Sequence, residues 1–507
     1  MTDFSLLPLL PEIFMALIAM GLLIAGVSTK NESTPVICWA SAIGLMMAAL
    51  VLLGMDWSPN VVLNGMFKMD QFAGMAKLMI LLGLLASIVL SVRYLEQERM
   101  GRFEYPVIVL IAGIGMMLMV SANNLLSLYM ALELQSLSLY VLAAFNRNST
   151  KSAEAGVKYF VLGALSSGML LFGMSLVYGF TGSLDFNTIH DTLLTIETIP
   201  AGFTIGMVFI LAGLAFKISA VPFHMWTPDV YQGAPLCVTA LFAIVPKTAA
   251  MALLIRLLLE AFGPAQDQWM QIIYFISVAS MIVGAFAAIA QEEIRRLIAY
   301  SSIGNMGYAL VGVIAATPQG IGAVLLYLFI YMVMTSGVFV VLAVMRREDK
   351  SLHKISDLAG LSRTSPALAY AMAVFMFSMS GIPPLAGFFS KLFIFQAAIA
   401  QGYIILAVLG VLTSVVAAYY YLRIVKVMFF DEPADKFNGG MSFSQRALLL
   451  ITVVFVLGFI LRPGLLVAST QNAAMALFGA EKLSENMPPV PLHLKAPESL
   501  DENSVEN

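Results

Sequence analysis

Fourteen stretches of roughly 20 mostly apolar residues constrain this chain more than any other feature of its sequence. A helix of that length spans the hydrocarbon core of a bilayer. Only 11% of the residues are charged, whereas soluble domains have about 25%. The sequence therefore predicts an all-α polytopic membrane protein with about 14 transmembrane helices. The stretches cover residues 6–27, 36–54, 70–92, 105–122, 124–144, 155–180, 202–231, 236–262, 268–290, 294–315, 319–345, 366–400, 402–429 and 446–470.

The composition also argues against several kinds of site. Two cysteines cannot hold an iron–sulfur cluster, which needs about four ligands. The sequence contains neither a phosphate-binding loop nor a dinucleotide-binding glycine motif. A net charge of -3 without a basic aromatic patch argues against nucleic acid as a partner. We therefore expect no redox cofactor, nucleotide or metal site on this chain.

Two of the apolar stretches are long and contain helix-breaking residues. Residues 202–231 include Pro222, and residues 366–400 include the run from Gly381 to Pro384. Broken helices in two halves of a chain are typical of transporters built from repeats. We expect spans 4–8 and 9–13 to form two inverted five-helix repeats, with broken helices at spans 7 and 12. The expected segments are an N-terminal three-helix segment (1–104), the two repeats (105–262 and 268–429), a C-terminal helix (430–480) and a disordered polar tail (481–507).

Lysine and arginine residues are concentrated in alternate connections between the spans. The odd-numbered connections carry most of them, and the even-numbered connections carry almost none apart from Lys68. Connections rich in these residues face the cytoplasm in most membrane proteins. With an even number of spans, both termini are then expected on the opposite, periplasmic side.

Charged residues inside the apolar spans are the strongest pointer to function. A charge at the centre of a bilayer costs at least about 2.5–3.5 kcal/mol, so an ion or proton path is the default reason to keep one. These residues are Lys77, Glu133, Lys158, Lys217, Lys247, Arg256 and Lys391. We expect structural roles for Lys77 and Arg256 and a proton path through the others.

Glu133 and Lys217 are expected to interact. Helical spacing puts Glu133 on one face with Ser136 and Tyr140, and a nearby lysine would keep the carboxylate charged. Pro222 frees a backbone carbonyl, and a broken helix within a membrane is tolerated where it lines a cavity or is buried in protein. Lys217 is therefore expected beside a wet pocket. A static ion pair that only joins two helices is the alternative.

Lys247 and Lys391 are further candidates for proton carriers. Lys247 follows Pro246 halfway along its span, too far from the helix ends for its side chain to reach water easily. It is the strongest candidate for a central proton site. Lys391 follows the second break, so each broken span combines a proline with a lysine within about two helical turns.

Five residues are secondary candidates. Lys158 follows an acidic residue by four positions and forms either a surface ion pair or part of a relay. His224 either transfers protons or caps the broken helix. Asp229 is expected near the cytoplasmic mouth, and Tyr300 and Ser302 offer hydroxyl groups to ordered water.

Three runs of sequence, residues 128–137, 216–231 and 292–303, resemble those of a known family. Together with the buried glutamate in the fifth span and the lysines in the broken seventh, intact eighth and broken twelfth spans, they resemble the antiporter-like subunits of respiratory complex I. Those subunits are related to subunits of multi-subunit Na⁺/H⁺ antiporters. The resemblance covers roughly residues 1–470. The polar C-terminal tail and the lysine at position 391 are similar to the subunit N branch of bacterial NADH:quinone oxidoreductases.

This resemblance implies a function and residue roles. Members of the family move protons through buried glutamate and lysine residues, driven by quinone reduction in neighbouring subunits. By this resemblance Glu133 pairs with Lys217 on the input side, Lys247 is the central carrier, and Lys391 is the terminal lysine. The sister subunits carry histidine in the tenth span, where this chain has Tyr300 and Ser301. A water wire is the expected substitute.

The resemblance also implies a setting. NADH, FMN, iron–sulfur clusters and quinone would belong to other subunits of the parent complex. The partners would be membrane-arm subunits, with sister subunit M and small subunit K as neighbours, in the inner membrane of a bacterial cell. A subunit of a redox-free cation/proton antiporter is the alternative function. A passive membrane scaffold is a third.

Overall fold

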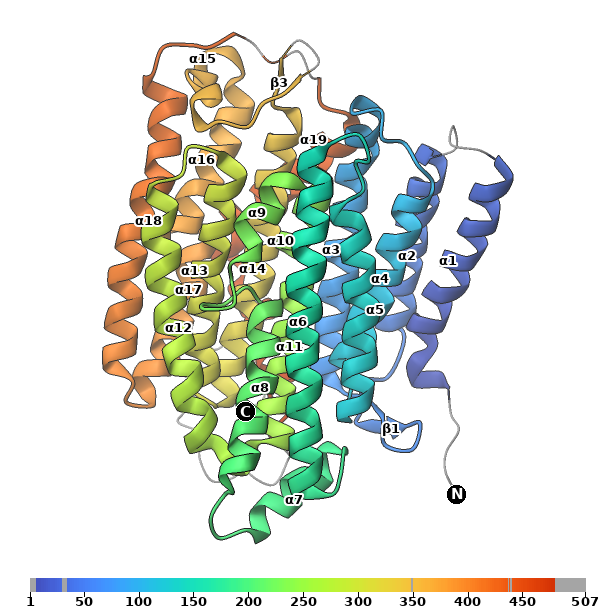
Figure 1. Ribbon diagram of the computed structural model, residues 1–507. Helices are drawn as coiled ribbons and strands as arrows, with labels where there is room; N and C mark the ends of the chain where they lie inside the picture. Colours follow the sequence, from blue (N-terminus) through green and yellow to red (C-terminus); the bar gives the residue numbers. More distant parts are fainter. Residues whose placement is uncertain (1–5, 30–33, 348–349, 436, 438–439, 479–507) are drawn as a thin grey trace, which may run out of the picture.

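The computed structural model describes residues 6–29, 34–347, 350–435, 437 and 440–478. Within these ranges, eleven helices are long and apolar enough to cross a membrane, and four shorter apolar helices accompany them. The prediction of a mainly α-helical, polytopic membrane protein is therefore confirmed (Figure 1). The tail predicted for residues 481–507 lies outside the described residues.

The N-terminal segment consists of three long helices and a β-hairpin. Asp70 begins the third long helix, because its carboxylate accepts a hydrogen bond from the amide of Ala73 at 2.7 Å. No periodic pattern in the sequence marks the strands of the hairpin, since each has three residues. The elements are η1 (Leu7–Leu9), α1 (Leu10–Thr29), α2 (Thr34–Leu53), β1 (Asn60–Val62), β2 (Phe67–Met69) and α3 (Gln71–Gln97).

The next segment contains the first broken span and one short helix that the apolar pattern does not predict. That helix is α7, which precedes the broken span and has a buried face formed by Phe186, Ile189 and Leu193. The elements are α4 (Glu104–Val120), α5 (Leu125–Ala143), α6 (Thr150–Thr181), α7 (Phe186–Thr195), α8 (Ala201–Lys217), α9 (Trp226–Gly233), α10 (Leu236–Ile244), α11 (Pro246–Arg256), the π-helical turn η3 (Leu257–Ala261) and η4 (Gly263–Ala265).

The last segment contains the second broken span and a second small hairpin. Both hairpins are additions to the expected all-α architecture, and both lie in connections rather than in spans. The elements are α12 (Gln266–Ile289), α13 (Ile294–Ile314), α14 (Pro318–Val344), β3 (Arg346–Arg347), β4 (Lys350–Ser351), η5 (Ile355–Leu358), α15 (Leu361–Thr364), α16 (Pro366–Ser380), α17 (Ala386–Ala400), α18 (Ile404–Phe430), α19 (Phe443–Gly458), η6 (Phe459–Leu461) and α20 (Pro463–Met475).

Both predicted breaks are present, and they begin with the same turn. Ser219 follows α8 with a φ of 62°, and Gly381 follows α16 with a φ of 87°. In each case the next amide donates to the carbonyl five positions earlier, at 2.8 Å after Ser219 and 3.1 Å after Gly381. This turn is a common end of a helix, and glycine adopts it readily. Serine adopts the left-handed backbone at a cost of about 1–2 kcal/mol.

The two broken spans run in opposite directions. In Figure 1, α8 lies in the lower half of the bundle and α9 in the upper half, whereas α16 lies above α17. The non-helical residues 218–225 and 381–385 therefore lie between the two ends of the bundle. Non-helical backbone at such a depth is tolerated where protein surrounds it or where it lines a polar cavity.

Two predicted spans are less regular than expected. The eighth span, expected to be intact, is divided at Val245 into α10 and α11, because Pro246 cannot donate a backbone hydrogen bond. Its last turn is the π-helical η3. The stretch 446–470 bends at Arg462, where α19 and η6 end and a proline begins α20.

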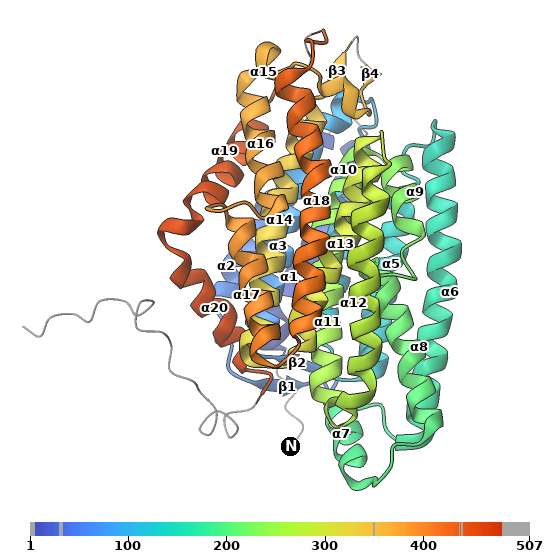
Figure 2. The same cartoon turned by 90° about the vertical axis from the view of Figure 1, so that its left-hand side faces the viewer.

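Three spans form the centre of the bundle: α10–α11, α13 and α14. The buried share of the most apolar 18-residue window is 100% for the span Leu236–Ala261 and 94% for Ile294–Ile314. The same share is 33% for Leu7–Thr29. Helix α14 packs against α3, α10, α13, α16 and α17, and Figure 2 shows it among them. The outer helices expose many large apolar side chains, as lipid-facing helices do.

The connections divide between two ends of the bundle. The hairpin β3–β4 and α15 lie at the upper end in Figure 2, and the hairpin β1–β2 and α7 lie at the lower end. The upper end holds the arginine-rich connection of Arg346, Arg347 and Arg363. Lys68, the main basic exception in the sequence pattern, lies in β2 at the lower end.

Candidate functional site

Lys217 is the last residue of α8 and lies at the first break. Its side chain is buried, and Nζ donates hydrogen bonds to Ser136 Oγ at 2.7 Å and to Tyr140 OH at 3.3 Å, both on α5. The helix dipole also favours a positive charge at the C-terminal end of α8. The Tyr140 ring centre lies 5.6 Å from Nζ. The local fold thus stabilises the ammonium with hydroxyl groups, a helix end and an aromatic ring.

Glu133 lies on α5 one turn before Ser136, as the helical spacing predicts, but it does not form the expected ion pair. Among the described residues, no carboxylate oxygen lies within 4.0 Å of Lys217 Nζ. Glu133 Oε1 is buried and accepts no hydrogen bond within the same part of the chain. Lys217 Nζ contacts the hydroxyl of Ser136 instead, one helical turn along α5 from Glu133.

Lys247 is the second residue of α11 and lies next to the division of its span at Val245. Its side chain is buried, and Nζ donates to Ser302 Oγ on α13 at 2.5 Å. Ser302 also accepts a hydrogen bond from Tyr331 OH on α14 at 2.7 Å. The ring centre of Tyr231 lies 5.5 Å from Nζ. In the described ranges, Lys247 has no carboxylate at ion-pair distance.

A buried polar stripe on α13 continues beyond Ser302. Positions 301, 305 and 308 lie on one face of the helix, because they are separated by about one turn each. Their hydrogen bonds link α13 to α14 and α18. The contacts are Ser301 Oγ with Tyr421 OH at 2.5 Å, Asn305 Nδ2 to the Ser301 carbonyl at 2.9 Å, Tyr327 OH to Asn305 Oδ1 at 2.6 Å, and Tyr308 OH to Thr413 Oγ1 at 3.3 Å.

Lys391 lies on α17, just after the second break. Nζ donates to the carbonyl of Met379 at 3.0 Å, near the C-terminal end of α16, and to Ser414 Oγ on α18 at 2.8 Å. It also lies 4.9 Å from the ring centre of Tyr308, which belongs to the α13 stripe. A Cβ on Gly381 would lie 3.3 Å from Lys391 Cδ, so glycine leaves room for the lysine as well as accommodating the positive φ.

Lys158 and Asp229 line the mouth of a small cavity. Lys158 Nζ contacts Glu154 at 2.7 Å, as the four-residue spacing predicts, and also contacts Asp229 at 2.8 Å. Asp229 binds Arg296 at 2.6 Å. The cavity has a volume of about 140 Å³, and its polar lining includes Lys151, Glu154, Lys158, Asp229 and Gln232. Since 42% of the Lys158 side chain is exposed, these groups exchange protons readily with bulk water.

His224 and Tyr300 make fewer contacts than expected. His224 lies in the first break, and its Nδ1 is buried without a hydrogen-bond partner among the described residues. Its backbone carbonyl accepts from the amide of Thr227 at 3.0 Å. Tyr300 is half-buried, and no hydrogen bond of its hydroxyl occurs within the described ranges. The neighbouring Ser301 and Ser302 make the polar contacts instead.

Buried hydroxyl groups extend from the first break to the neighbourhood of Lys247. Ser219 Oγ, Thr227 Oγ1 and Tyr231 OH have no hydrogen-bond partner in the described part of the chain. Buried polar atoms of this kind are usually satisfied by ordered water. The hydroxyl groups near the first break and near Lys247 are therefore available to bind ordered water.

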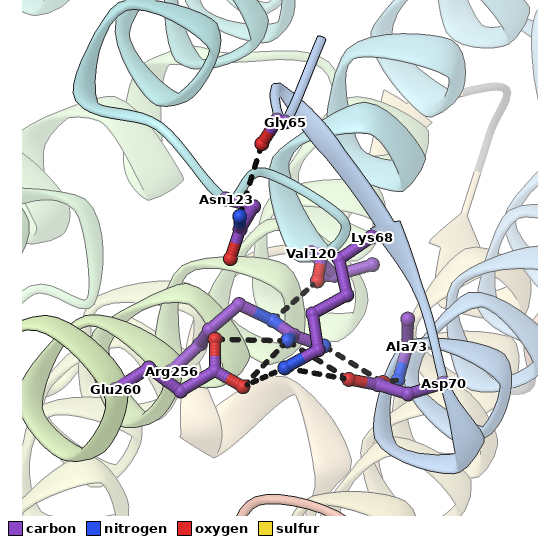
Figure 3. Close-up of polar contacts among 8 residues, drawn as sticks. All are labelled: Gly65, Lys68, Asp70, Ala73, Val120, Asn123, Arg256 and Glu260. Atoms are coloured by element: carbon purple, nitrogen blue, oxygen red, sulfur yellow. Dashed lines mark hydrogen bonds and ion pairs between the residues drawn. The ribbon is translucent and has the colours of Figure 1, made fainter. Parts of the chain in front are cut away.

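Arg256 lies in a buried cluster of charges that also includes Lys68, Asp70 and Glu260, here called the α3–α11 ion cluster (Figure 3). The Arg256 guanidinium donates to Asp70 through two bonds, at 2.8 and 2.9 Å, and to Glu260 at 3.0 Å. Its Nε donates to the carbonyl of Val120 at 3.1 Å. Lys68 Nζ contacts Glu260 Oε1 at 2.8 Å. The basic exception among the even-numbered connections is therefore explained by an ion pair.

Lys77 also has an acidic partner. Its Nζ lies 2.7 Å from Glu12 Oε1 of α1, and both side chains are almost fully buried. The ring centre of Phe67 lies 4.5 Å from the ammonium. Lys77 and Arg256, expected to be structural, are thus both ion-paired, whereas Lys217, Lys247 and Lys391 are not paired at contact distance within the described ranges. We call these three residues the lysine axis.

Comparison with known families identifies a large part of the chain. Residues 122–417 match the family described as NADH:quinone oxidoreductase/Mrp antiporter, TM. The NADH-quinone oxidoreductase subunit N of Parvibaculum lavamentivorans is 54% identical over 475 residues, which cover 93% of this chain and 97% of that protein. The subunit N of Rhodospirillum rubrum is 52% identical over 472 residues, which cover 93% of this chain and 97% of that protein.

Solved structures have the same fold. A chain of respiratory complex I from Thermus thermophilus with bound aureothin is 33% identical and has a TM-score of 0.78, covering 90% of this chain and 98% of that chain. A chain of the Mrp complex from Dietzia sp. has a TM-score of 0.81 at 23% identity, covering 92% and 98%. The second likeness shows a shared fold alone. Among the described residues, no group of three or more His, Cys, Asp or Glu residues could hold a metal ion.

Proposed function

The chain belongs to the family of NADH-quinone oxidoreductase subunit N, and on this premise we propose that its lysine axis carries protons across the membrane arm of the complex. It is a subunit of a proton-translocating NADH-quinone oxidoreductase. The redox reaction takes place in other subunits, which hold NADH, FMN, the iron–sulfur clusters and quinone, and it supplies the energy. The residues of this chain bind, hold and release protons.

The observation that carries the proposal is the setting of the lysine axis. Each lysine is buried and is held by hydroxyl groups, by carbonyls at helix ends or by aromatic rings. A buried ammonium without a contacting carboxylate is costly, and it can lower that cost by losing its proton. The hydroxyl groups that hold it can accept and donate hydrogen bonds in either protonation state. This is what a proton carrier requires.

The proposed proton path passes these groups in order. Protons enter beside Lys158 and Asp229, where the cavity meets water. Ser136 and Tyr140 hold Lys217, and the unpartnered hydroxyls near the first break support a water wire to Lys247. From Lys247, Ser302 begins the α13 stripe, which leads towards Lys391. Tyr300 and His224 contribute less, because neither the Tyr300 hydroxyl nor His224 Nδ1 has a hydrogen-bond partner in the described part of the chain.

Electrostatic coupling between the carriers supplies the direction. Two unit charges about 7 Å apart interact by roughly 2–3 kcal/mol at an effective dielectric constant near 20. When Glu133 moves away from Lys217, the unshielded ammonium of Lys217 repels that of Lys247 and drives a proton towards Ser302. When Glu133 closes on Lys217 the repulsion falls and Lys247 binds a proton again. The bond of Lys217 to Ser136, and the lack of a hydrogen-bond partner for Glu133 Oε1 among the described residues, support this role because the pair is not locked.

We propose fourteen transmembrane spans in the predicted segments. The two opposed breaks, with the same terminal turn, support two inverted five-helix repeats (105–262 and 268–429), preceded by a three-helix segment (1–104) and followed by a C-terminal helix (430–480). The eleven long helices and four shorter ones give fourteen spans when α16 and α17 are counted as one broken span. Deletion of the segment after residue 480 is expected to leave these spans in place.

The orientation is part of the same proposal. The arginine-rich connections lie at one end of the bundle, which supports a cytoplasmic location for that end and a periplasmic location for both termini, in the inner membrane of a bacterial cell. Lys158, Asp229 and Arg296 then lie on the cytoplasmic half. Subunits M and K are the proposed neighbours, and Lys391, the terminal lysine, leads either to the exit on the opposite side or to the next subunit. Cross-linking at either side of the purified complex tests this arrangement.

A subunit of a redox-free antiporter is less well supported. The fold likeness to the Mrp complex accommodates it, but the relatives named above at 52–54% identity are subunits N of NADH-quinone oxidoreductases. Purification separates the two functions. Co-isolation with flavin and iron–sulfur subunits supports the proposal, and isolation with antiporter subunits alone contradicts it.

The substitution Lys247→Ala tests the proton path directly. In closed, inverted membrane vesicles, NADH-driven electron transfer to quinone and proton uptake are recorded together. We expect normal assembly and fewer protons taken up per electron. Thr248→Ala is the matched control, since Thr248 is also buried on α11 but donates to the backbone carbonyl of Ile244. An unchanged ratio in assembled Lys247→Ala complex would remove Lys247 from the path.

A further inference from the structure

Helix α11, which carries Lys247, is a short segment between two irregularities. It has 11 residues, begins after the division at Val245 and ends at the π-helical turn η3. Pro246 supplies no amide donor at the division, and the π-helical turn changes the hydrogen-bond pattern at the other end. The regular helix is therefore weakened at both ends of α11, and side-chain contacts contribute more to its position. Its charged residues are Lys247 near one end and Arg256 at the other.

Lys247 and Arg256 anchor α11 from opposite sides. They are nine positions apart, which corresponds to about 2.5 helical turns and a rise of about 13.5 Å. Lys247 therefore faces α13, where it binds Ser302. Arg256 faces α3 and α4, where it binds Asp70 and the carbonyl of Val120. The residues between them are buried and mostly apolar.

The contacts of Arg256 define a single orientation of the guanidinium. Asp70 accepts two parallel bonds, Val120 accepts one from Nε, and Glu260 accepts from Nη1 through both carboxylate oxygens (Figure 3). A planar guanidinium held by such a fork resists rotation, which a lysine ammonium would not. Glu260 reaches this position from the π-helical turn that directly follows α11.

We propose that Arg256 is a positioning residue for Lys247, and that the α3–α11 ion cluster fixes the rotation and height of α11. The side-chain envelope of a helix has a radius of about 5–6 Å, so a rotation of about 10° moves a side-chain tip by about 1 Å. A displacement of that size can slow a positioned transfer step by about 10²-fold. The cluster thereby keeps Lys247 Nζ against Ser302. This inference rests on the proposed role of Lys247 as a proton carrier.

In this proposal the N-terminal three-helix segment holds the residues that fix α11. Asp70 is the N-cap of α3, so the anchor of Arg256 is itself fixed to the first turn of a buried helix. The pair Lys77–Glu12 joins α3 to α1. This second pair shares α3 with the cluster, but no hydrogen bond or ion pair joins it to α11 within the described ranges, which makes it a matched control.

The test compares two double variants in which both partners of a buried ion pair become neutral. Asp70→Asn with Arg256→Gln removes the anchor, keeps an N-cap side chain and leaves Lys68 paired with Glu260. Glu12→Gln with Lys77→Met removes the control pair. The proton-to-electron ratio and its pH profile are measured in vesicles containing assembled complex. The same pairs of substitutions are repeated with Lys247→Ala.

We expect the Asp70/Arg256 variant to lose most of the protons per electron that Lys247→Ala loses and to shift the pH profile. The Glu12/Lys77 variant should keep the original ratio and profile. In the Lys247→Ala background, the Asp70/Arg256 changes should have no further effect. Equal effects of the two double variants, or an undiminished effect without Lys247, would overturn the positioning role. If the Lys247→Ala variant alone pumps normally, the proposed function fails. That outcome is distinguished from failure of the positioning role, because Lys247→Ala is also measured without the other substitutions.

If the Asp70/Arg256 double variant does not assemble, the single substitution Arg256→Lys tests the same proposal. It retains the charge but not the planar fork. A reduced proton-to-electron ratio with a shifted pH profile in assembled complex supports the proposal. A ratio and profile equal to those of the original protein overturn it.

Discussion

The lysine axis and the α3–α11 ion cluster both bury positive charge, but they hold it in opposite ways. Lys217, Lys247 and Lys391 are held by hydroxyl groups, carbonyls and rings. Arg256 is held by Asp70 and Glu260 at 2.8–3.0 Å. In this respect Lys77, paired with Glu12, belongs with the cluster although it is a lysine.

The difference separates charges that can move from charges that cannot. An arginine is always protonated in proteins, and a contacting carboxylate stabilises its charge further. Loss of one partner of such a pair leaves an uncompensated buried charge and costs about 3–5 kcal/mol. A lysine bonded to hydroxyls leaves no charge behind when it releases its proton. Its neutral amine keeps the ability to form hydrogen bonds. The contacts of a buried cation therefore indicate its role better than its burial does.

The largest expected effect is the loss of assembly on breaking the cluster. Arg256→Met leaves Asp70 without its fully buried partner, so we expect a destabilisation of about 3–5 kcal/mol and little subunit in the membrane. Lys391→Met is the comparison, since no carboxylate loses an ion-pair partner among the described residues. The amount of assembled complex and its thermal unfolding midpoint measure the difference. An equal loss of assembled complex from Arg256→Met and Lys391→Met would contradict the distinction between the ion cluster and the lysine axis.

An intermediate effect is expected at the hydroxyl that holds Lys247. Ser302→Ala removes the acceptor at 2.5 Å, and a hydrogen bond to a charged group contributes about 1.5–3 kcal/mol. The proton-to-electron ratio should fall while assembly remains normal. Ser277→Ala is the control, because Ser277 is also a buried serine but donates to the carbonyl of Gly307 at 2.8 Å. A ratio that falls equally in both variants would contradict a specific role of Ser302.

The smallest expected effect is at Tyr300. Its hydroxyl has no hydrogen bond among the described residues, so Tyr300→Phe should leave stability within about 0.5 kcal/mol and proton uptake unchanged. Tyr331→Phe should lower proton uptake, because Tyr331 OH donates to Ser302 at 2.7 Å. Measuring proton uptake in vesicles that contain each variant shows which of the two tyrosines takes part in the proton path. Loss of uptake in Tyr300→Phe would place the water wire on the other side of α13.

The helices, the breaks and the buried charges could be predicted from the sequence because they depend on local properties. Apolar runs mark the spans, and prolines mark the two breaks. The division of the eighth span at Val245 was not predicted, although Pro246 follows it directly. The family and the function inferred from the resemblance are confirmed by the relatives. The count of fourteen spans and the repeats remain predictions.

The partners of the charges could not be predicted, because they come from distant parts of the chain. Arg256 and Asp70 are separated by 186 positions, and Lys247 and Ser302 by 55. The expected contact between Glu133 and Lys217 is absent from the described residues, because the packing of α8 brings Ser136 rather than Glu133 to the lysine. Tyr331 and Ser414 were not candidates, since isolated hydroxyl residues in apolar helices carry no signal of their own.

The two broken spans also place their lysines differently. Lys217 precedes the left-handed residue Ser219 by two positions, whereas Lys391 follows the equivalent Gly381 by ten. Lys217 is the last residue of its half-helix, and Lys391 contacts the C-terminal end of the preceding half-helix. At both ends the helix dipole favours a cation. Spacing from a proline indicates that a lysine is near the break, but packing decides which half-helix carries it.

One measurement tests the central claim most directly. It compares the proton-to-electron ratio of assembled complex carrying Lys247→Met with that of complex carrying Glu12→Gln and Lys77→Met. Both remove a buried lysine charge, and neither leaves a carboxylate without its ion-pair partner. The lysine held by hydroxyls should carry protons and the ion-paired lysine should not, so the ratio should fall in the first complex and stay unchanged in the second. An unchanged ratio in the first, or an equal fall in both, would contradict the claim that the contacts of a buried lysine determine its role.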